Sequence, residues 1–408
     1  MDALTVYLHD RPVGMLAEDG GRMSFSYSAD YVRGKGEPLS HSLPVRLEPY
    51  VHDEVEPYLS NLLPDDIVRT RIGAILQIPR ENTFALLKAI GGDCAGAVAF
   101  FPEGQSPGAN PGKYRELDDD EAARILGNLS LRPLDIGDEG FRISGAGAQD
   151  KLIACYVGGR VVLPLHGTPS SHIIKTPLLD YPDSVENEWF SMHLAAACGL
   201  KAASCEIALI GGRRHYITER YDRIVDGTRT ERLHQEDFCQ MLKVDPKHKY
   251  EVLGGPGIAA SLSLLRDAST SAADTLEFLN RVVFNFLLGN GDAHGKNFSV
   301  IYRNGGAELS PAYDLMSTAI YPEVGRRMAM KIDGEYEFRW ITRGKFLRMG
   351  EKSGISANIV EKALNRMSVR ICREAPRLAS SAARKWPSGC YAQIVAGIQA
   401  RAAAIRSA

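Results

Sequence analysis

Short apolar runs separated by turn-forming residues dominate the first hundred residues of the chain. Residues 4–8 and 97–101 are two such runs, and residues 59–78 between them carry apolar positions at helical spacing. This pattern predicts a small, β-rich unit over residues 1–102. The next stretch, residues 103–113, collects Gly, Pro, Ser and Asn, which predicts a linker.

Beyond the linker, short apolar runs alternate with glycine-containing turns and predict a second sheet. A glycine-rich loop at residues 144–149 comes first, and helical spacing at residues 184–198 interrupts the strands. The pattern predicts a unit over residues 114–222 with a sheet of about five strands. These strands are expected at residues 151–157, 160–164, 172–175, 206–210 and 215–218.

Toward the end of the chain the pattern becomes mainly helical. Residues 271–288 give the clearest case, with apolar positions that recur every three or four residues. Ser271 and Asp274 at their start resemble a capping box. The Ala-rich end, residues 382–408, predicts a final helix. Together these patterns predict an α+β protein whose last unit, residues 223–408, is mainly helical.

Composition changes this picture little. The 408 residues suffice for two or three packed units, and no apolar run approaches the roughly 18 residues of a membrane span. The start of the chain lacks the basic and apolar stretches of a secretion signal, so we expect a cytoplasmic protein.

Seven cysteines without a CxxC pair disfavour a disulfide framework and a zinc ribbon. The net charge of −2 gives no general reason to expect tight nucleic-acid binding.

The polar loop that follows the predicted helix at 271–288 carries the strongest chemical signal. Asp292 precedes Asn297 by five positions, and Asp314 follows after a predicted hairpin. Phosphoryl transfer needs a carboxylate that orients a hydroxyl and oxygen ligands for magnesium, and these three residues supply them. His294 and Lys296 are candidates to steady charge on the phosphate, with Lys296 favoured because it is cationic at neutral pH. Two alternatives stay open: Asp292 as a simple turn residue, and His294 as a transition-metal ligand.

The nucleotide half of such a site requires a cation for the phosphates and a flexible cover. Lys175 at a strand end is the candidate cation, and Glu188 is its candidate partner. Glu219 to Tyr221 are candidates for a linker that binds adenine through its backbone. No GxxxxGK[ST] sequence is present, which disfavours a P-loop nucleotidase. The candidate cover consists of Ser144, Gly145, Ala146, Gly147, Ala148 and Gln149.

With these residues in view, the chain resembles the HipA kinases, which are serine/threonine kinase toxins of bacterial type II toxin–antitoxin pairs. The resemblance extends over nearly the whole chain and implies a two-lobed, protein-kinase-like fold with a small N-terminal subdomain. Two departures stand out: Asp150 replaces the family's Glu before Lys151, and no Gly follows Asp314. The motifs that carry the resemblance lie at residues 144–151, 234–240, 290–297 and 310–314.

The resemblance implies a role for each matching residue. Asp292 would be the catalytic acid, Asn297 and Asp314 magnesium ligands, Lys175 the phosphate-binding lysine and Ser144 a site of autophosphorylation. A phosphate on Ser144 would add about −1.5 to −2 charges to the loop above ATP, so loop ejection and self-inactivation are expected. The motif at 234–240 receives no catalytic role.

The resemblance also implies partners. Members of the family phosphorylate translation components, notably an aminoacyl-tRNA synthetase for glutamate, and a small helix-turn-helix antitoxin that binds DNA restrains them. Contact of this chain with DNA would then be mainly indirect. Two rival functions remain open: a small-molecule or lipid kinase, and a catalytically idle module that strengthens DNA binding by a partner.

Overall fold

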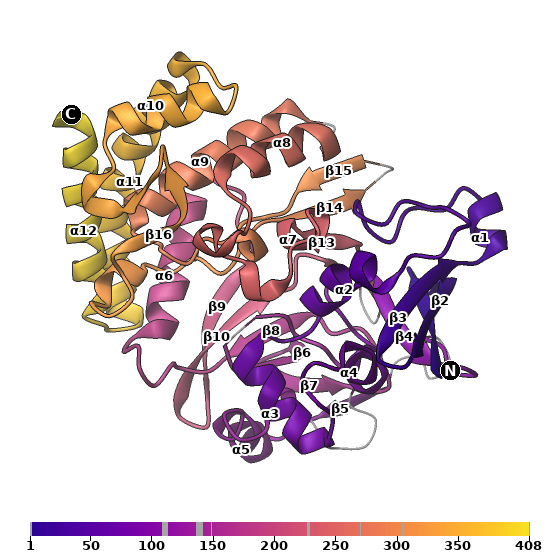
Figure 1. Cartoon of the computed structure of the whole chain (residues 1–408). Coiled ribbons are helices and arrows are strands. Elements are labelled where there is room, and N and C mark those ends of the chain that lie inside the picture. Colours follow the sequence, from indigo (N-terminus) through magenta and orange to yellow (C-terminus); the bar gives the residue numbers. More distant parts are fainter. Residues whose placement is uncertain are drawn as a thin grey trace. The chain divides into compact units, whose positions relative to one another are not determined.

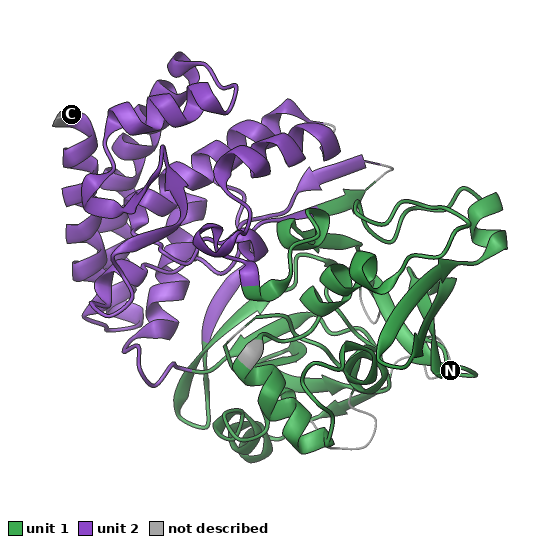
Figure 2. Ribbon diagram, in the orientation of Figure 1, with its two compact units in different colours: residues 1–176, 208–247, 301–305 green, residues 177–207, 248–300, 306–408 purple. Residues whose placement is uncertain are grey.

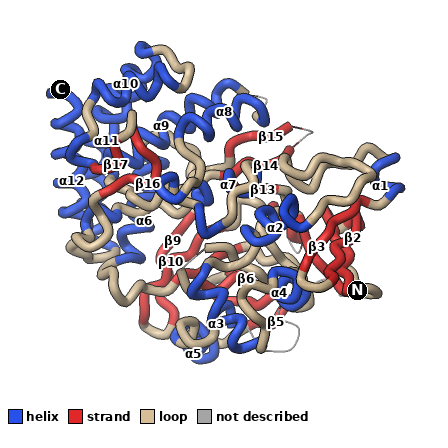
Figure 3. Tube along the Cα trace, viewed as in Figure 1, coloured by secondary structure: helices blue, strands red, loops and turns tan. Residues whose placement is uncertain are grey.

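The computed structural model describes residues 2–107, 113–135, 142–147, 149–226, 229–269, 271–303 and 306–407. The chain forms two compact units (Figures 1 and 2). Strands predominate in unit 1 and helices in unit 2 (Figure 3), which confirms the predicted α+β class. The predicted ranges 1–102, 103–113, 114–222 and 223–408 divide the chain differently and stay a prediction. Unit 1 comprises residues 1–176, 208–247 and 301–305, and unit 2 comprises residues 177–207, 248–300 and 306–408.

Unit 1 opens with an antiparallel sheet of strand order β3-β2-β1-β4. Alternate residues of β1, namely Leu4, Val6 and Leu8, are buried, which is the period-two pattern of a strand with one face in the core. The strands are β1 (Asp2–Leu8), β2 (Arg11–Asp19), β3 (Arg22–Tyr27) and β4 (Val98–Pro102).

The helical spacing at residues 59–78 comes from two helices and not from one. The first ends at Asn61 and the second begins at Asp66, with Pro64 between them. Proline lacks a backbone N–H and disfavours the helical conformation of the residue before it, which favours a break at this position. The helices of this part are α1 (Ala29–Arg33), α2 (His52–Asn61), α3 (Asp66–Leu76) and α4 (Thr83–Ile90).

A six-stranded sheet follows, with the order β5-β7-β6-β8-β10-β9. The five predicted strands are present, and the three-residue β5 adds an edge strand too short to show a sequence period. Lys151 lies opposite Lys175, which in turn lies opposite Tyr216. The strands are β5 (Tyr114–Glu116), β6 (Lys151–Val157), β7 (Arg160–Pro164), β8 (His172–Lys175), β9 (Cys205–Ile210) and β10 (Arg213–Glu219).

One apolar core joins the two sheets of unit 1, because buried residues from Leu4 to Ile217 form a single cluster. The remaining elements of this unit are short. They are α5 (Asp119–Gly127), η1 (Pro133–Asp135), β11 (Arg223–Asp226), β12 (Arg229–Arg232), β13 (Gln235–Asp237) and α7 (Phe238–Met241), followed at the boundary by η2 (Pro246–His248).

Unit 2 is built around helix α9 (Ala272–Leu288), whose apolar residues from Phe278 to Leu287 are buried as the spacing predicts. After this helix come the polar loop and the hairpin of β14 and β15. In the described ranges, no helix combines the length and apolar character of a membrane span. Strand β14 (Ser299–Arg303) begins in unit 2 and ends in unit 1. The other elements are α6 (Ser184–Ala197), η3 (Glu251–Leu253), α8 (Ile258–Ala268), η4 (Gly295–Asn297), β15 (Gly306–Leu309), η5 (Thr318–Ile320), β16 (Arg327–Ile332), β17 (Glu335–Glu337), η6 (Phe338–Trp340), α10 (Arg343–Lys352), α11 (Ala357–Lys385) and α12 (Cys390–Ser407).

One local prediction in unit 2 is wrong, and another is right in kind but not in its bounds. Ser271 caps α9 by accepting a hydrogen bond from the Ala273 N–H, but Asp274 does not close a capping box. Its buried carboxylate instead accepts a 2.9 Å hydrogen bond from the Leu309 N–H. This tertiary contact competes with the capping bond for the same side chain. The predicted final helix is present as α12, but it begins at Cys390 and not at residue 382, because α11 stops before Pro387 and α12 starts after it.

Candidate active site

The predicted catalytic loop begins in unit 2 where helix α9 ends. Gly289 caps this helix in a left-handed conformation (φ +78°), which glycine adopts without steric cost. Arg401 of α12 donates hydrogen bonds of 2.9 Å to the carbonyls of Leu287 and Leu288. Since a cation is favourable at the C-terminus of a helix, the last helix of the chain fixes the start of the loop.

Asp292 and Asn297 lie close together in this loop. The Asn297 Nδ2 donates a 2.7 Å hydrogen bond to the Asp292 carbonyl, and the Asp292 N–H donates to Asn290 Oδ1 at 3.0 Å. The Asp292 side chain is 45% exposed, so its carboxylate is accessible to a substrate hydroxyl. The five-residue spacing therefore brings a carboxylate and an amide into one loop.

Two rings flank the Asp292 carboxylate. His294 Nε2 lies 3.9 Å from Asp292 Oδ1, and the Tyr250 hydroxyl donates a hydrogen bond to the same oxygen. The rings of Tyr250 and His294 meet edge to face with their centroids 4.9 Å apart. Tyr250 belongs to no motif that the sequence indicated, and pattern reasoning missed it.

Lys296 and Asp314 lie on either side of the hairpin that follows the loop. Lys296 is buried, and its carbonyl accepts a 2.7 Å hydrogen bond from the Tyr313 hydroxyl. The same hydroxyl lies 2.6 Å from Ser299 Oγ, which ties the loop to the hairpin and to the residue before Asp314. Asp314 itself is exposed and has a left-handed backbone with φ +56°. Aspartate tolerates this region better than most residues, and such strain often marks functional sites.

The glycine-rich loop of unit 1 is packed inward. Ser144 is 2% exposed, and its hydroxyl donates a 2.6 Å hydrogen bond to the Leu62 carbonyl between α2 and α3. Gly147, with φ +108°, accepts a hydrogen bond at its carbonyl from the Asp65 N–H. Its positive φ requires glycine.

The other predicted cover residues differ in what holds them. An added Cβ at Gly145 would lie 3.1 Å from Ile153, so close packing also favours glycine there. Ala146 uses its carbonyl to accept a hydrogen bond from Lys151, and Gln149 donates to the Thr176 carbonyl at 3.1 Å. The prediction for Ala148 lies outside the described residues.

Lys175 is buried at the end of β8 and faces two notable neighbours across the sheet. Its ammonium lies 5.5 Å from the centre of the Tyr216 ring, a distance suited to a cation–π contact. Lys151 occupies the opposite position on β6, which brings two buried cations side by side. Sequence reasoning missed Lys151, although it closes the loop motif. Glu188 belongs to unit 2, and its pairing with Lys175 stays a prediction.

The predicted adenine-binding segment ends strand β10. Glu219 is exposed opposite His172, and the Tyr221 hydroxyl donates a 2.8 Å hydrogen bond to Gln235. Between them, Arg220 donates its backbone N–H to the Ser171 carbonyl at 2.9 Å and buries its guanidinium.

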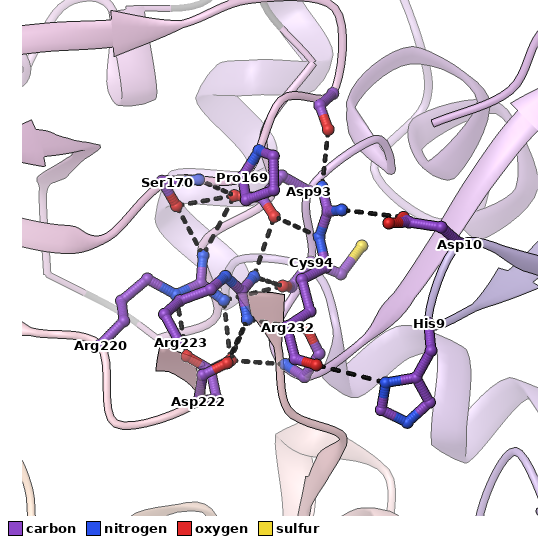
Figure 4. Close-up of polar contacts among 12 residues, drawn as sticks. His9, Asp10, Asp93, Cys94, Pro169, Ser170, Arg220, Asp222, Arg223 and Arg232 are labelled. Atoms are coloured by element: carbon purple, nitrogen blue, oxygen red, sulfur yellow. Dashed lines mark hydrogen bonds and ion pairs between the residues drawn. The ribbon is translucent and has the colours of Figure 1, made fainter. Parts of the chain in front are cut away.

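A buried charge network surrounds that guanidinium (Figure 4). The Asp93 carboxylate lies 2.9 Å from Arg223, 3.1 Å from Arg232 and 3.3 Å from Arg220, and Asp222 lies 2.8 Å from Arg220. Burial alone would raise the pKa of Asp93, but the three guanidinium groups outweigh it, so that this pKa lies well below its usual range. No sequence pattern indicates this network, because Asp93 and the arginines that bind it come from distant segments.

The motif at 234–240 joins several segments of unit 1. Asp237 caps α7 in a capping box with Gln240, which agrees with the expectation of a helix start. Glu236 is fully buried and accepts hydrogen bonds from Ser40 Oγ at 2.5 Å, from the His41 N–H at 2.7 Å and from the Tyr302 hydroxyl. Burial raises the pKa of Glu236 to about 7. The motif therefore has a structural role in unit 1.

Comparison with known proteins decides the family. Residues 4–101 match the family model of the HipA N-terminal domain, and residues 143–375 match that of the HipA-like C-terminal domain. The chain belongs to the HipA family. This membership confirms the predicted resemblance and the assignment as a serine/threonine kinase.

Individual relatives agree with this membership. The serine/threonine-protein kinase toxin HipA of Shewanella oneidensis is 32% identical over 90% of this chain and 87% of its own length. Y4mE of Sinorhizobium fredii is 39% identical over 89% of both chains. A solved complex of Shewanella oneidensis HipA, HipB and operator DNA contains a chain that aligns with a TM-score of 0.86 and 28% identity, covering 99% of this HipA-family chain and 97% of that chain. The kinase-like architecture is therefore confirmed.

Proposed function

We propose that this HipA-family chain is an ATP- and Mg²⁺-dependent protein kinase that arrests growth as a toxin. The observation that carries the proposal is the loop after α9, in which Asn297 bonds the main chain of Asp292 and the Asp292 carboxylate stays exposed. An exposed carboxylate at that point can orient an acceptor hydroxyl and take its proton. Asp292 is therefore the proposed catalytic residue.

The donor set in unit 2 fits a magnesium ion. Asn297 uses its amide N–H in the bond to Asp292, which leaves the amide oxygen for a metal, and Asp314 is exposed after the hairpin. Magnesium prefers such oxygen ligands. Asn297 and Asp314 would hold the ion, which would neutralise charge on the phosphates of ATP. His294 and Lys296 are proposed to contact the phosphates from the same loop.

Unit 1 supplies the proposed nucleotide-binding residues. Lys175 is the proposed phosphate ligand, supported by its buried position beside Lys151 at the edge of the glycine-rich loop. Glu219 and Tyr221 are proposed to bind adenine through their backbone, and the buried bonds of Arg220 between them keep this segment in place.

Autophosphorylation of Ser144 is part of the proposal. In the present conformation the Ser144 hydroxyl is buried against the Leu62 carbonyl, where a phosphate carrying about two negative charges would lack both room and water. Phosphorylation should therefore require the loop to leave this position and should prevent its return. Such a change would inactivate the enzyme.

The proposed partners follow the solved relative, which was crystallised with HipB and operator DNA. We expect a HipB-like helix-turn-helix antitoxin to neutralise this chain and to provide most of the contact with DNA. The proposed substrate is a protein of the translation apparatus, such as an aminoacyl-tRNA synthetase.

Incubation with labelled ATP and Mg²⁺, alone and with cell lysate, tests this function. Label should appear on Ser144 and on a lysate protein, and mass spectrometry would identify both. Asp292→Asn should abolish most labelling and relieve growth arrest, whereas Asp267→Asn, a change at an exposed position of α8, should do neither. Label confined to small molecules would refute protein phosphorylation, and growth arrest that survives Asp292→Asn would favour an idle binding role.

A further inference from the structure

Tyr250 is held firmly beside the proposed catalytic loop. Its neighbour Lys249 uses its carbonyl to accept a 3.1 Å hydrogen bond from the Gly295 N–H inside that loop. On the other side, the Glu251 carboxylate accepts a 2.7 Å bond from the Lys331 N–H and lies 3.2 Å from the Lys331 ammonium. The residues on both sides of Tyr250, Lys249 through its backbone and Glu251 through its side chain, are thus tied to other elements of unit 2.

Tyr250 itself is restrained as well, both in its main chain and in its ring. The Tyr250 carbonyl accepts 2.9 Å hydrogen bonds from the N–H groups of Leu253 and Gly255, which close the turn at η3. The ring packs edge to face against His294. A phenylalanine ring would make the same packing contacts, so packing does not account for the hydroxyl. That hydroxyl donates to Asp292 Oδ1.

The Asp292 carboxylate needs such a restraint. The bonds from Asn297 and to Asn290 fix the main chain of Asp292, and neither of them touches its carboxylate. The terminal torsion of aspartate has a broad energy minimum, and this side chain is 45% exposed. Without a fixed donor, the two carboxylate oxygens would rotate relative to the acceptor hydroxyl.

We propose that Tyr250 is a positioning residue for phosphoryl transfer, which holds Asp292 Oδ1 and thereby presents Oδ2 to the acceptor hydroxyl. The inference rests on the proposed function of Asp292. Tyr250 contacts the carboxylate and not the substrate, so it acts on the transfer step and leaves ATP binding unchanged. General-base catalysis contributes about 10² to 10⁴ in rate, and its efficiency depends on this geometry.

The variant Tyr250→Phe tests the proposal, because it removes the hydroxyl and keeps the ring. The maximal rate of labelling from radioactive ATP should fall about tenfold or more, while the KM for ATP stays within about twofold of wild type. Tyr336→Phe, a matched change at a partly exposed tyrosine of β17, should leave the rate unchanged. An unchanged maximal rate in Tyr250→Phe would overturn the inference, and so would a parallel loss of ATP affinity and thermal stability, which would indicate a purely structural role.

A double variant separates action through Asp292 from other effects. Asp292→Asn should retain about 1% of the rate, which radiolabel detects, and adding Tyr250→Phe should change that remainder by less than about twofold. A further tenfold loss in the double variant would show that Tyr250 acts independently of the carboxylate and would overturn the proposal. Wild-type protein that transfers no label would instead refute the proposed kinase function itself.

Discussion

The buried charge network in unit 1 yields a quantitative prediction. Asp93→Asn keeps the shape of the side chain but removes the negative charge shared by Arg220, Arg223 and Arg232. The carboxylate also accepts bonds of 3.0 Å and 2.6 Å from the N–H and hydroxyl of Ser170. Both bonds from Ser170 end on Oδ2, whereas Arg223 and Arg232 donate to Oδ1. An amide accepts at only one of its two terminal atoms, so the donors at the other position lose their partner.

The expected loss follows from burial. Removing one partner of a buried ion pair costs about 3–5 kcal/mol, because the remaining charge stays uncompensated in a poorly solvated site. Ser170→Ala removes a neutral hydroxyl that donates to Asp93 and accepts a 2.8 Å bond from Arg220, and it should cost about 1.5–3 kcal/mol. Asp2→Asn, which breaks a solvent-exposed pair with Lys88 in the same unit, should have no measurable effect. The three variants form a graded series, so the comparison survives even if Asp93→Asn folds poorly.

Hydrogen exchange of the peptide covering residues 216–226 measures this loss locally, and urea unfolding followed by circular dichroism measures it globally. The three tryptophans, Trp189, Trp340 and Trp386, belong to unit 2, so their fluorescence reports separately on that unit. Asp93→Asn should also weaken ATP binding, because Arg220 anchors the proposed adenine-binding segment. A loss of stability below about 1 kcal/mol in Asp93→Asn would refute the reasoning.

Three further outcomes are expected. Asp292→Asn should lower turnover by at least about 10², measured as initial rate of label transfer; a smaller loss would exclude Asp292 as the base. Ser144→Ala should abolish labelling of the glycine-rich loop and, by leaving the Leu62 carbonyl unpaired, cost about 1–3 kcal/mol in urea unfolding; label that persists at this loop would contradict the assignment. Glu236 has its folded-state pKa raised to about 7, so the stability that it contributes is complete below its unfolded pKa and is lost as the pH rises through about 7. The difference in unfolding free energy between wild type and Glu236→Gln should therefore shift by about 3 kcal/mol between pH 4.5 and pH 7.5, and a pH-independent difference would refute this.

Local patterns predicted the parts of this fold in which one segment determines its own structure. The buried face of α9 and the five strands of the larger sheet follow from periodicity. Errors arose where another segment competes for the same group. Asp274 could have capped its own helix, but its carboxylate bonds the Leu309 N–H instead. Pro64 and Pro387 each lie between two helices, where the spacing of apolar residues had predicted one continuous helix. Both prolines are in the sequence and could have indicated the breaks.

The candidate site was predictable to the extent that its residues share one loop. Asp292 and Asn297 carry a spacing that is itself the signal, and the structure places them in contact. Tyr250 lies far from Asp292 along the chain. A single tyrosine forms no spacing pattern with other residues, so the sequence does not mark it as part of the site. The sequence likewise gives no signal for Asp93, because its arginine partners come from segments more than a hundred residues away. Such groups become recognisable only when the fold brings their polar atoms within hydrogen-bonding distance.

Asp93 connects the two segments of unit 1 that we propose to bind nucleotide. Its side chain holds Arg220 in the proposed adenine-binding segment, and its carbonyl accepts a 3.1 Å hydrogen bond from the Ser144 N–H in the glycine-rich loop. A phosphate on Ser144 would break the buried bond to Leu62 and pull on the main chain next to Asp93. Loss of the loop and loosening of the adenine-binding segment would then occur together. Phosphorylation of Ser144 would therefore weaken the binding of ATP at both of its ends, the phosphates and the adenine base.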